Sequence, residues 1–567
     1  MNSNLNVTHS FTYKDLLLKK LYYSVICSVF SQLVLLQIYV LLSNVDIFHP
    51  IQWILTSLKT FTSFNTWLFV IPFLGIIFAQ SIICAKDYVF KSNYCSTRFQ
   101  KFISAFSMHN LVLLIFHVLA GPMLIWLFLS LGGGNYQSLT KAAENKTYVL
   151  NEGSFFLILS GFWTGFYYFL KVYISEKHLA FPIIQQRKWL QLKAQMGPLL
   201  KESFLLSVWP TMYYIIIYAI WGSTFRTSLK NTLGLLSDEN SGGIIVNLYL
   251  WCFSAIYYFN MNLMKFFFNV FLTELVEFPL YKISQNFLNL QESILLSDLP
   301  IIQNLACLDL YTLSQWSPQR RQVFFTLSQP GGHPHNWNLL IENVLKLLKE
   351  YTDLLGKSTE NKDVVKQPLI PGQLKSPLQS PDKFQNLRNM SLLSDPAFVD
   401  IVDVTHSNLP GIQLTETLFT KLKQKINNII NVTKVLLGID FMFGELPQAN
   451  IQKCLANGLI IIWTTQGISD LVCAALTEDK YGIVQKDIPG IVTTIVQLKQ
   501  NLDKLNKVSA LTKKVAGYDD FNYKMKGAIT TSLKRSLFNI CRTYRNYMSD
   551  FPLSKDVSAY LYTICKS

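Results

Sequence analysis

Long apolar runs dominate the first half of the 567-residue chain. A helix that crosses a membrane needs about 20 mostly apolar residues, because the hydrocarbon core is about 30 Å thick and a helix rises about 1.5 Å per residue. Six stretches meet this requirement, and they cover residues 21–42, 66–85, 110–131, 154–173, 203–221 and 244–264. The first begins too far into the chain, and is too long, for a cleavable signal peptide. The pattern therefore predicts a membrane domain over residues 1–265 with about six transmembrane helices.

Positive charge alternates from one side of this domain to the other. Lys and Arg concentrate before the first stretch and in the segments that follow the second, fourth and sixth stretches. The opposite loops contain only Lys59, Lys141, Lys146, Arg226 and Lys230. Because loops rich in Lys and Arg stay in the cytosol, both ends of the membrane domain are expected to be cytosolic. The sequon at Asn145 then lies on the lumenal side, where it is a candidate glycosylation site.

After residue 265 the apolar positions still recur with a helical period, but in shorter, amphipathic runs. Candidate helices cover residues 266–293, 298–315, 335–355, 414–437, 449–477, 488–509, 521–548 and 554–565. The run over 454–475 resembles a seventh span, but Gly458, Gln466 and Asp470 interrupt it and favour a buried core helix. The chain as a whole is predicted to be all-α, with a polytopic membrane part and a C-terminal α-helical cytosolic domain.

Composition divides this second half into three parts. Residues 266–355 are predicted to form a membrane-proximal helical region, and residues 411–567 a C-terminal α-helical domain. Between them, residues 356–410 are interrupted by prolines among Ser, Gln and Asp, which is typical of a flexible linker. Ser376 and Ser380 each precede a proline there, so they are candidate sites for proline-directed kinases. The alternative is that both are ordinary linker residues.

The predicted helix over residues 414–437 combines an apolar face with a basic one. Its apolar positions are Leu418, Phe419, Leu422, Ile426, Ile429 and Ile430. Its basic positions include Lys421, Lys423 and Lys425. Such a helix can lie in the interface of an anionic membrane. An ordinary surface helix on a soluble core would show the same pattern, so both interpretations stand.

Composition supports a membrane protein without a nucleic-acid interface. Half of the residues are apolar and only 15% are charged, against about 25% charged in a typical soluble domain. The formal net charge of +15 is explained by cytosolic loops that face anionic lipid. Clustered Arg with interleaved aromatic residues on a soluble face, which would indicate nucleic-acid binding, is missing from the sequence. The nine cysteines include no C-x-x-C pair and predict neither a zinc site nor a disulfide framework.

Catalytic motifs are also missing from the sequence. There is no phosphate-binding loop, no dinucleotide fingerprint, no H-E-x-x-H and no G-x-S-x-G. Apart from Lys171 at the end of the fourth stretch, the six stretches contain no Asp, Glu, Lys or Arg. His117 is the remaining candidate for a functional ionisable group, and a neutral histidine bonded to a neighbouring helix explains it. We therefore expect a non-enzymatic anchor or scaffold without cofactor, metal or small-molecule substrate. The alternative is a multipass transporter or a lipid-modifying membrane enzyme.

One segment is far more specific than the rest of the chain. It begins at residue 305 and contains Ser317, Pro318, Arg320, Arg321, Gln329, Pro330, Gly331, Gly332, His333, Pro334, His335, Asn336 and Trp337. Supporting motifs are Phe181 to Gln186 before the fifth span and Leu476 to Gln485 near the C-terminus. Together with the six-span layout, this set resembles the signature of the transmembrane nucleoporins of the nuclear-division-cycle (Ndc) family, over nearly the whole chain.

The signature also has a physical interpretation. Pro330, Gly331 and Gly332 are typical of a turn, since glycine supplies positive φ. Asn336, a favoured N-cap residue, is expected to cap the helix that begins near Trp337. The two arginines at 320 and 321 suit acidic partners or lipid headgroups. The alternative is that the whole block is a rigid elbow between helices.

The resemblance implies a component of the membrane ring of the nuclear pore complex, placed in the nuclear envelope. Members of the family anchor the pore, and fungal members also help to insert spindle pole bodies. Their soluble half engages scaffold nucleoporins, including the amphipathic RRM-containing type and, in animals, the WD-repeat protein aladin. These partners are expectations for this chain, and the resemblance assigns none of them to particular residues.

Overall fold

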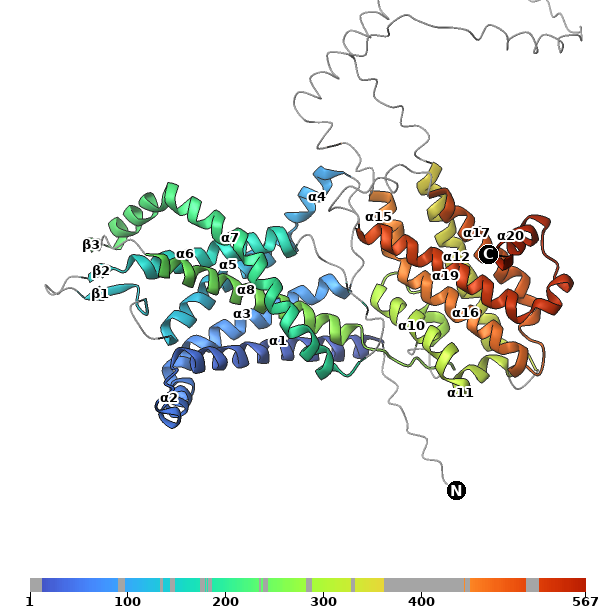
Figure 1. Cartoon of the computed structure of the whole chain (residues 1–567), viewed down its shortest axis with the longest axis horizontal. Helices are drawn as coiled ribbons and strands as arrows, with labels where there is room; N and C mark the ends of the chain where they lie inside the picture. Colours follow the sequence, from blue (N-terminus) through green and yellow to red (C-terminus); the bar gives the residue numbers. More distant parts are fainter. Residues whose placement is uncertain are drawn as a thin grey trace, which may run out of the picture.

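The fold is known from a computed structural model. It describes residues 13–89, 97–132, 136–142, 148–173, 186–233, 236–237, 243–281, 288–327, 332–360, 449–505 and 520–566, together with Leu179, Phe181 and Phe443. Two bodies of helices lie end to end (Figure 1). The membrane half contains the helices up to residue 272, and the soluble half contains those from residue 290 onward.

Six long apolar helices build the membrane half. They are α1 (Tyr13–Ser43), α3 (Phe64–Val89), α5 (Met108–Leu131), α6 (Glu152–Tyr168), α7 (Lys188–Leu233) and α8 (Ile244–Leu272). The π-helical turn η1 (Phe169–Tyr173) extends α6. Each predicted span falls within one of these helices, with the stretch 154–173 covered by α6 together with η1. With 46 residues, α7 is about 69 Å long at 1.5 Å per residue, so it extends well beyond the hydrocarbon core.

Two short helices and a small sheet complete the described part of the membrane half. Helix α2 (Pro50–Thr62) joins α1 to α3, and α4 (Arg98–Ala105) precedes α5. The strands β1 (Thr140–Ala142), β2 (Tyr148–Leu150) and β3 (Leu236–Ser237) form one sheet in that order. β1 and β2 are antiparallel, with Thr140 opposite Leu150, whereas β2 and β3 are parallel. Helix α2 and the sheet lie at the end of the bundle remote from the soluble half (Figure 1).

Glycine allows two of the spans to touch through their backbones. A Cβ atom built on Gly161 would lie 2.5 Å from the backbone of Pro122 on α5, and one on Gly165 would lie 2.1 Å from the carbonyl oxygen of His117. Small residues at the spacing Gly-x-x-x-Gly are the usual means of close helix approach in membranes. This face of α6 therefore fixes how α5 and α6 pack.

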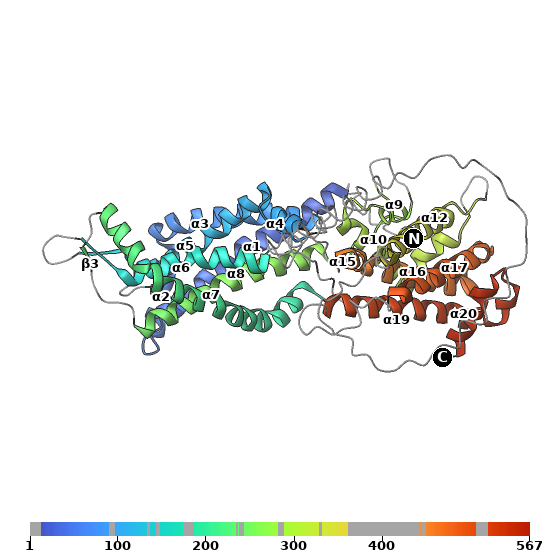
Figure 2. The ribbon, with the colours of Figure 1, turned by 90° about the horizontal axis from the view of Figure 1, so that it is seen from above.

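The soluble half is a bundle of helices around one apolar core. Its longer helices are α10 (Pro300–Trp316), α12 (His335–Glu360), α16 (Gly458–Glu478), α17 (Ile488–Lys504) and α19 (Asp520–Thr543). Shorter pieces are α9 (Leu290–Ser293), α11 (Pro318–Arg321), η2 (Gln322–Phe325), α15 (Ala449–Ala456), η3 (Gln485–Asp487), η5 (Arg545–Asp550) and α20 (Lys555–Lys566). Figures 1 and 2 show α16 in the middle of this body, between α10 and α19. The all-α fold class is therefore confirmed.

Helix α16 lies in this core. Seven helices of the described residues are long and apolar enough to cross a membrane, and α16 is one of them. Its apolar window is 61% buried by the rest of the protein, against 28–56% for the other six. Ser469 donates a hydrogen bond to the carbonyl of Ser536 at 3.0 Å, and Thr465 contacts Ser532 at 3.3 Å. This packing agrees with the interpretation of residues 454–475 as a buried core helix.

Three predicted element boundaries are wrong. The helix expected over 266–293 ends at Leu272, and residues 275–279 have no regular secondary structure. Pro279 disfavours helix in the residue before it, and the backbone of Phe278 bonds to side chains of α10 and α11 instead. The helix expected over 449–477 is split at Asn457 into α15 and α16, and Gly458, the first residue of α16, lies directly against Met525 of α19. The linker is predicted from residue 356, whereas α12 continues to Glu360.

The ends of two other helices also differ. Helix α17 ends at Lys504 rather than at residue 509, and α19 ends at Thr543, after which the chain tightens into the 3₁₀ turn η5. Short 3₁₀ pieces are frequent where a helix stops. These differences do not alter which helices form the core.

Candidate functional site: the signature junction

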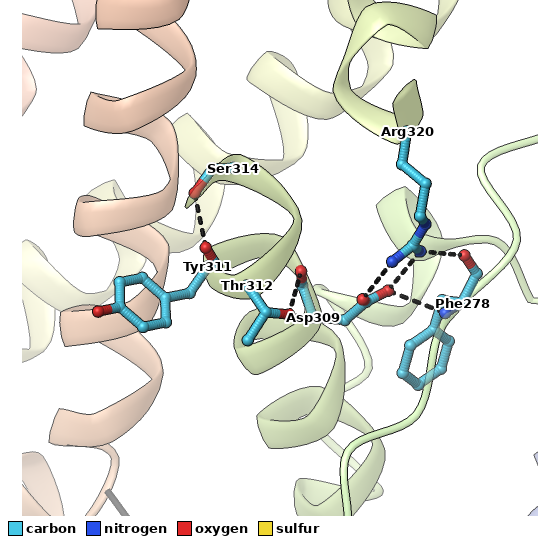
Figure 3. A network of polar contacts seen from close by, with 6 residues as sticks. All are labelled: Phe278, Asp309, Tyr311, Thr312, Ser314 and Arg320. Atoms are coloured by element: carbon cyan, nitrogen blue, oxygen red, sulfur yellow. Dashed lines mark hydrogen bonds and ion pairs between the residues drawn. The ribbon is translucent and has the colours of Figure 1, made fainter. Parts of the chain in front are cut away.

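The centre of the signature is a buried aspartate that holds together three segments of chain. Asp309, on α10, is fully buried. Arg320 of α11 donates two hydrogen bonds to its carboxylate, from Nη1 at 2.7 Å and from Nη2 at 2.9 Å. The backbone N–H of Phe278 donates to the same carboxylate at 2.8 Å, and Nη2 of Arg320 donates to the Phe278 carbonyl at 2.9 Å. Figure 3 shows these contacts converging on Asp309.

The negative charge of Asp309 is balanced by the guanidinium of Arg320. Burial raises the pKa of its carboxyl, whereas the hydrogen bonds and positive charge of Arg320 and the N–H of Phe278 act to lower it. The pKa of Arg320 is raised, because the contact with Asp309 outweighs the effect of its burial. A buried carboxylate without such a partner would be strongly unfavourable. The pair therefore depends on both members being present.

The next arginine reaches in another direction. Arg321 donates through Nε to Glu478, the last residue of α16, at 2.8 Å, and through Nη1 to the carbonyl of Ser314 at 2.9 Å. Between α10 and α11, the carbonyl of Ser317 accepts from the backbone N–H groups of both arginines, and Pro318 occupies the first turn of α11. This tight turn aims neighbouring arginines at two different acids.

The second part of the signature forms the turn into α12. Gly332 has φ of +66°, the left-handed conformation that favours glycine. Asn336 is not the N-cap, which corrects the prediction: α12 already begins at His335, directly after Pro334. The carbonyl of Pro334 accepts the first intrahelical hydrogen bond, from the backbone N–H of Asn338 at 2.9 Å, so Pro334 occupies the N-cap position.

Trp337 links this turn to the C-terminal motif. Its ring is fully buried, and its Nε1–H donates to Asp487 at 2.8 Å. Nearby, Lys486 donates to the side chain of Asn338 at 3.0 Å. Asp487 lies in η3, two residues after the motif Leu476 to Gln485, which contains Glu478. The two most specific stretches of sequence, about 150 residues apart, therefore bind each other directly.

The junction also contacts the membrane half. Phe278 lies just beyond the end of α8, so the Asp309–Arg320 pair fixes the chain where it leaves the bundle. Phe181, from the motif before α7, packs edge-on against Trp463 of α16, with ring centroids 5.2 Å apart. The soluble half thus holds the two chain segments that adjoin the spans, at Phe278 and at Phe181. We call this set of contacts, centred on Asp309, the signature junction.

Comparison with known proteins identifies the family to which the chain belongs. A family model described as Nucleoporin protein Ndc1-Nup matches residues 15–559. The chain is 26% identical over 563 residues to Nucleoporin Ndc1 of Drosophila melanogaster, with 95% of each chain covered. It is 25% identical over 644 residues to Nucleoporin NDC1 of Homo sapiens, covering 94% of this chain and 95% of the human one. The chain belongs to the Ndc1 nucleoporin family.

Membership of the Ndc1 family places the protein in a cellular structure. It is a nuclear pore component and a multi-pass membrane protein of the nuclear envelope, in agreement with its apolar helices. As a nucleoporin of this family, it interacts with the membrane and with other nucleoporins of the pore. The family resemblance, the fold class and the localisation predicted from the sequence are therefore confirmed.

The two signature arginines face acids of the same chain. The expectation that they meet lipid headgroups or acidic partner proteins is replaced by the contacts with Asp309 and Glu478. Both acids occur in the quoted motifs, but the sequence assigned them no role. The sequence did contain a signal for such a pair, namely an aspartate among leucines on a helix face expected to be buried. Buried charges are usually paired, so this aspartate predicts a cationic partner.

Other predicted residues of the Ndc1 chain fall outside the described part. These are Gln329, Pro330, Gly331, Asn145, Ser376, Ser380 and the helix over 414–437 with all of its named apolar and basic positions. Within the bundle, His117 lies 3.0 Å from the amide nitrogen of Gln80 on α3 and 3.0 Å from the hydroxyl of Tyr257 on α8. This is the bonded histidine that the sequence suggested. The described residues contain no group of three potential metal ligands.

Proposed function

We propose that this protein is a non-enzymatic membrane anchor of the nuclear pore complex. Its six-helix bundle holds it in the nuclear envelope, and its soluble half tethers scaffold nucleoporins and supports pore assembly. The observation that carries the proposal is the signature junction. Because Asp309 and Arg320 clamp the chain at Phe278, a protein bound to the soluble half is held at a defined position relative to the membrane.

The proposed topology has both ends of the membrane half on the cytosolic or pore side. Supporting it, Lys and Arg concentrate on that side and are sparse on the other. The soluble half then faces the proteins of the pore scaffold. The partners that we propose are scaffold nucleoporins, namely the amphipathic RRM-containing type and the WD-repeat protein aladin, without direct contact to nucleic acid.

A second membrane contact is proposed for residues 414–437. The basic residues Lys421, Lys423 and Lys425 beside an apolar face would suit an anionic, curved membrane surface. To test this, the full chain is held in nanodiscs and anionic vesicles are added. Reversing the three charges is expected to reduce binding of the vesicles to the soluble half. Unchanged binding would leave this segment as an ordinary surface helix.

Localisation with proximity labelling tests the anchor function. The full-length chain carries the labelling enzyme at its C-terminus in one line and at its N-terminus in a matched line. We expect a punctate nuclear rim, and the C-terminal enzyme should enrich scaffold nucleoporins. Both the N-terminal and the C-terminal enzyme should label proteins of the pore side rather than of the lumen. A diffuse endoplasmic-reticulum or plasma-membrane pattern without nucleoporins would reject the proposal in favour of a transporter or a lipid-modifying enzyme.

A further inference from the structure

Helix α2 is an exposed apolar element that the predicted six-span layout did not include. It lies at the end of α1 and α3 remote from the soluble half, and it runs across the direction of these helices (Figure 1). Several of its large side chains and those just before it are more than half exposed, namely Ile47, Phe48, Ile51, Ile54, Leu55 and Leu58. Phe48 is 91% exposed.

The residues of α2 divide into three faces at about 100° of rotation per residue. Ile51, Ile54, Leu55 and Leu58 share one face, and it is exposed. Gln52, Thr56 and Lys59 share a second face, which is polar. The third face contains Trp53, Ser57 and Phe61 and turns toward the bundle. An apolar face, a polar face and a docking face thus coexist on a single short helix.

Specific contacts fix α2 on the bundle. The indole of Trp53 donates to the carbonyl of Leu41 on α1 at 2.6 Å, and the hydroxyl of Thr66 on α3 donates to the carbonyl of Thr60 at 2.6 Å. Just before the helix, the side chain of Asp46 accepts from the backbone N–H of Phe48 at 3.1 Å. The exposed apolar face is therefore held in one orientation.

We propose that α2 lies in the plane of the membrane, with its apolar face in the leaflet opposite the soluble half. The occupant is lipid, because the face is continuous with lipid-facing side chains at the same end of the spans: Leu42 of α1 is 67% exposed and Phe64 of α3 is 83% exposed. Lys59 is the only charged residue of α2, so the contact does not require anionic lipid. With the topology proposed above, this is the lumenal leaflet.

The position of α2 allows it to limit how far the bundle can move through the bilayer. This role rests on the proposed anchor function and extends it. Pulling the soluble half away from the membrane would drag Gln52, Thr56 and Lys59 into the hydrocarbon. Polar groups are unfavourable there without partners. Helix α2 therefore acts as a stop that sets the depth of the bundle in the bilayer.

Lipid photocrosslinking of the full chain tests this placement. The protein is reconstituted in nanodiscs of phosphatidylcholine that include a lipid with a photoreactive acyl chain, and adducts are mapped by mass spectrometry. We expect adducts on Ile51, Leu55 and Leu58 to exceed those on Gln52 and Thr56 several-fold. Because no nucleoporin is present, the result is independent of pore localisation, so either proposal can fail alone.

Two matched variants sharpen the test. Leu55→Glu places a carboxylate on the apolar face and is expected to reduce adducts over residues 47–62 several-fold, while those on α3 persist. Thr56→Glu adds the same charge on the polar face and is expected to preserve the pattern. Equal reaction on all faces of α2, or no adducts there while α1 and α3 react, would overturn the proposal. Crosslinks from α2 to a second copy of the chain would overturn it as well.

Discussion

Replacing Arg320 with glutamine should destabilise the soluble half strongly. The substitution removes the charge that balances Asp309, which is fully buried, and two hydrogen bonds to its carboxylate. Removing one member of a buried ion pair costs about 3–5 kcal/mol. For a unit of about 150–250 residues, each kcal/mol lowers Tm by about 2–4 °C, so we expect a decrease of about 6–20 °C.

The effect of this substitution should depend on pH in a defined direction. Burial already raises the pKa of Asp309, and Arg320 is the main group that opposes this rise. Without Arg320 the pKa of Asp309 rises further, so the carboxyl is protonated on moderate acidification. A neutral carboxyl no longer needs a counter-charge. The deficit in stability relative to the unchanged protein should therefore be largest at alkaline pH and shrink as pH falls.

Thermal unfolding of the full chain in detergent, followed by intrinsic fluorescence, measures this deficit. Arg542→Gln is the matched control, because Arg542 is exposed on α19 and its replacement should change stability by about 0.5 kcal/mol or less. Combining Asp309→Asn with Arg320→Gln should recover part of the loss, since no buried charge remains. Equal Tm values for the Arg320 and Arg542 variants, or a deficit that grows in acid, would refute the reasoning.

Three further outcomes follow from the packing. Gly165→Ala should destabilise the membrane half by about 1–3 kcal/mol or more, because the added Cβ would overlap the carbonyl of His117. Gly75→Ala is the control and should be tolerated, because the space around Gly75 is open. Monodispersity and Tm in detergent are measured for both variants. Trp337→Phe removes a buried donor and should lower stability by about 1 kcal/mol in thermal unfolding. Burial raises the pKa of Cys307 to about 12, so iodoacetamide at about pH 8 should modify it only after denaturation, as mass spectrometry would show.

The spans were predictable because a long apolar run is a local property of sequence. Each of the six predicted stretches lies inside one helix, and α16 was placed in the soluble core because Gln466 and Asp470 interrupt its apolar run. Helical periodicity likewise located α10, α12 and α17 to within a few residues. In these cases the apolar pattern within one helix was enough to predict where that helix lies.

The boundaries that failed depend on contacts from distant segments. After α8 ends at Leu272, the backbone of Phe278 bonds to Asp309 and Arg320, and neither residue is near in sequence. Helix α2 was missed for a related reason: its apolar positions occupy only part of a short helix, and its place across the spans is set by Trp53 and Thr66. Local pattern could not supply either contact.

The signature junction determines how freely the soluble half can move. Without the clamp on Phe278, residues 273–281 would act as a tether that reaches about 30 Å when extended. A nucleoporin bound to the soluble half would then occupy a large volume above the bilayer, and its effective concentration at any second site would fall. With the clamp in place and α2 setting the depth of the bundle, the binding surface stays at one distance from the membrane. Weak contacts with several pore proteins can then act together, because their geometry is fixed before any of them binds.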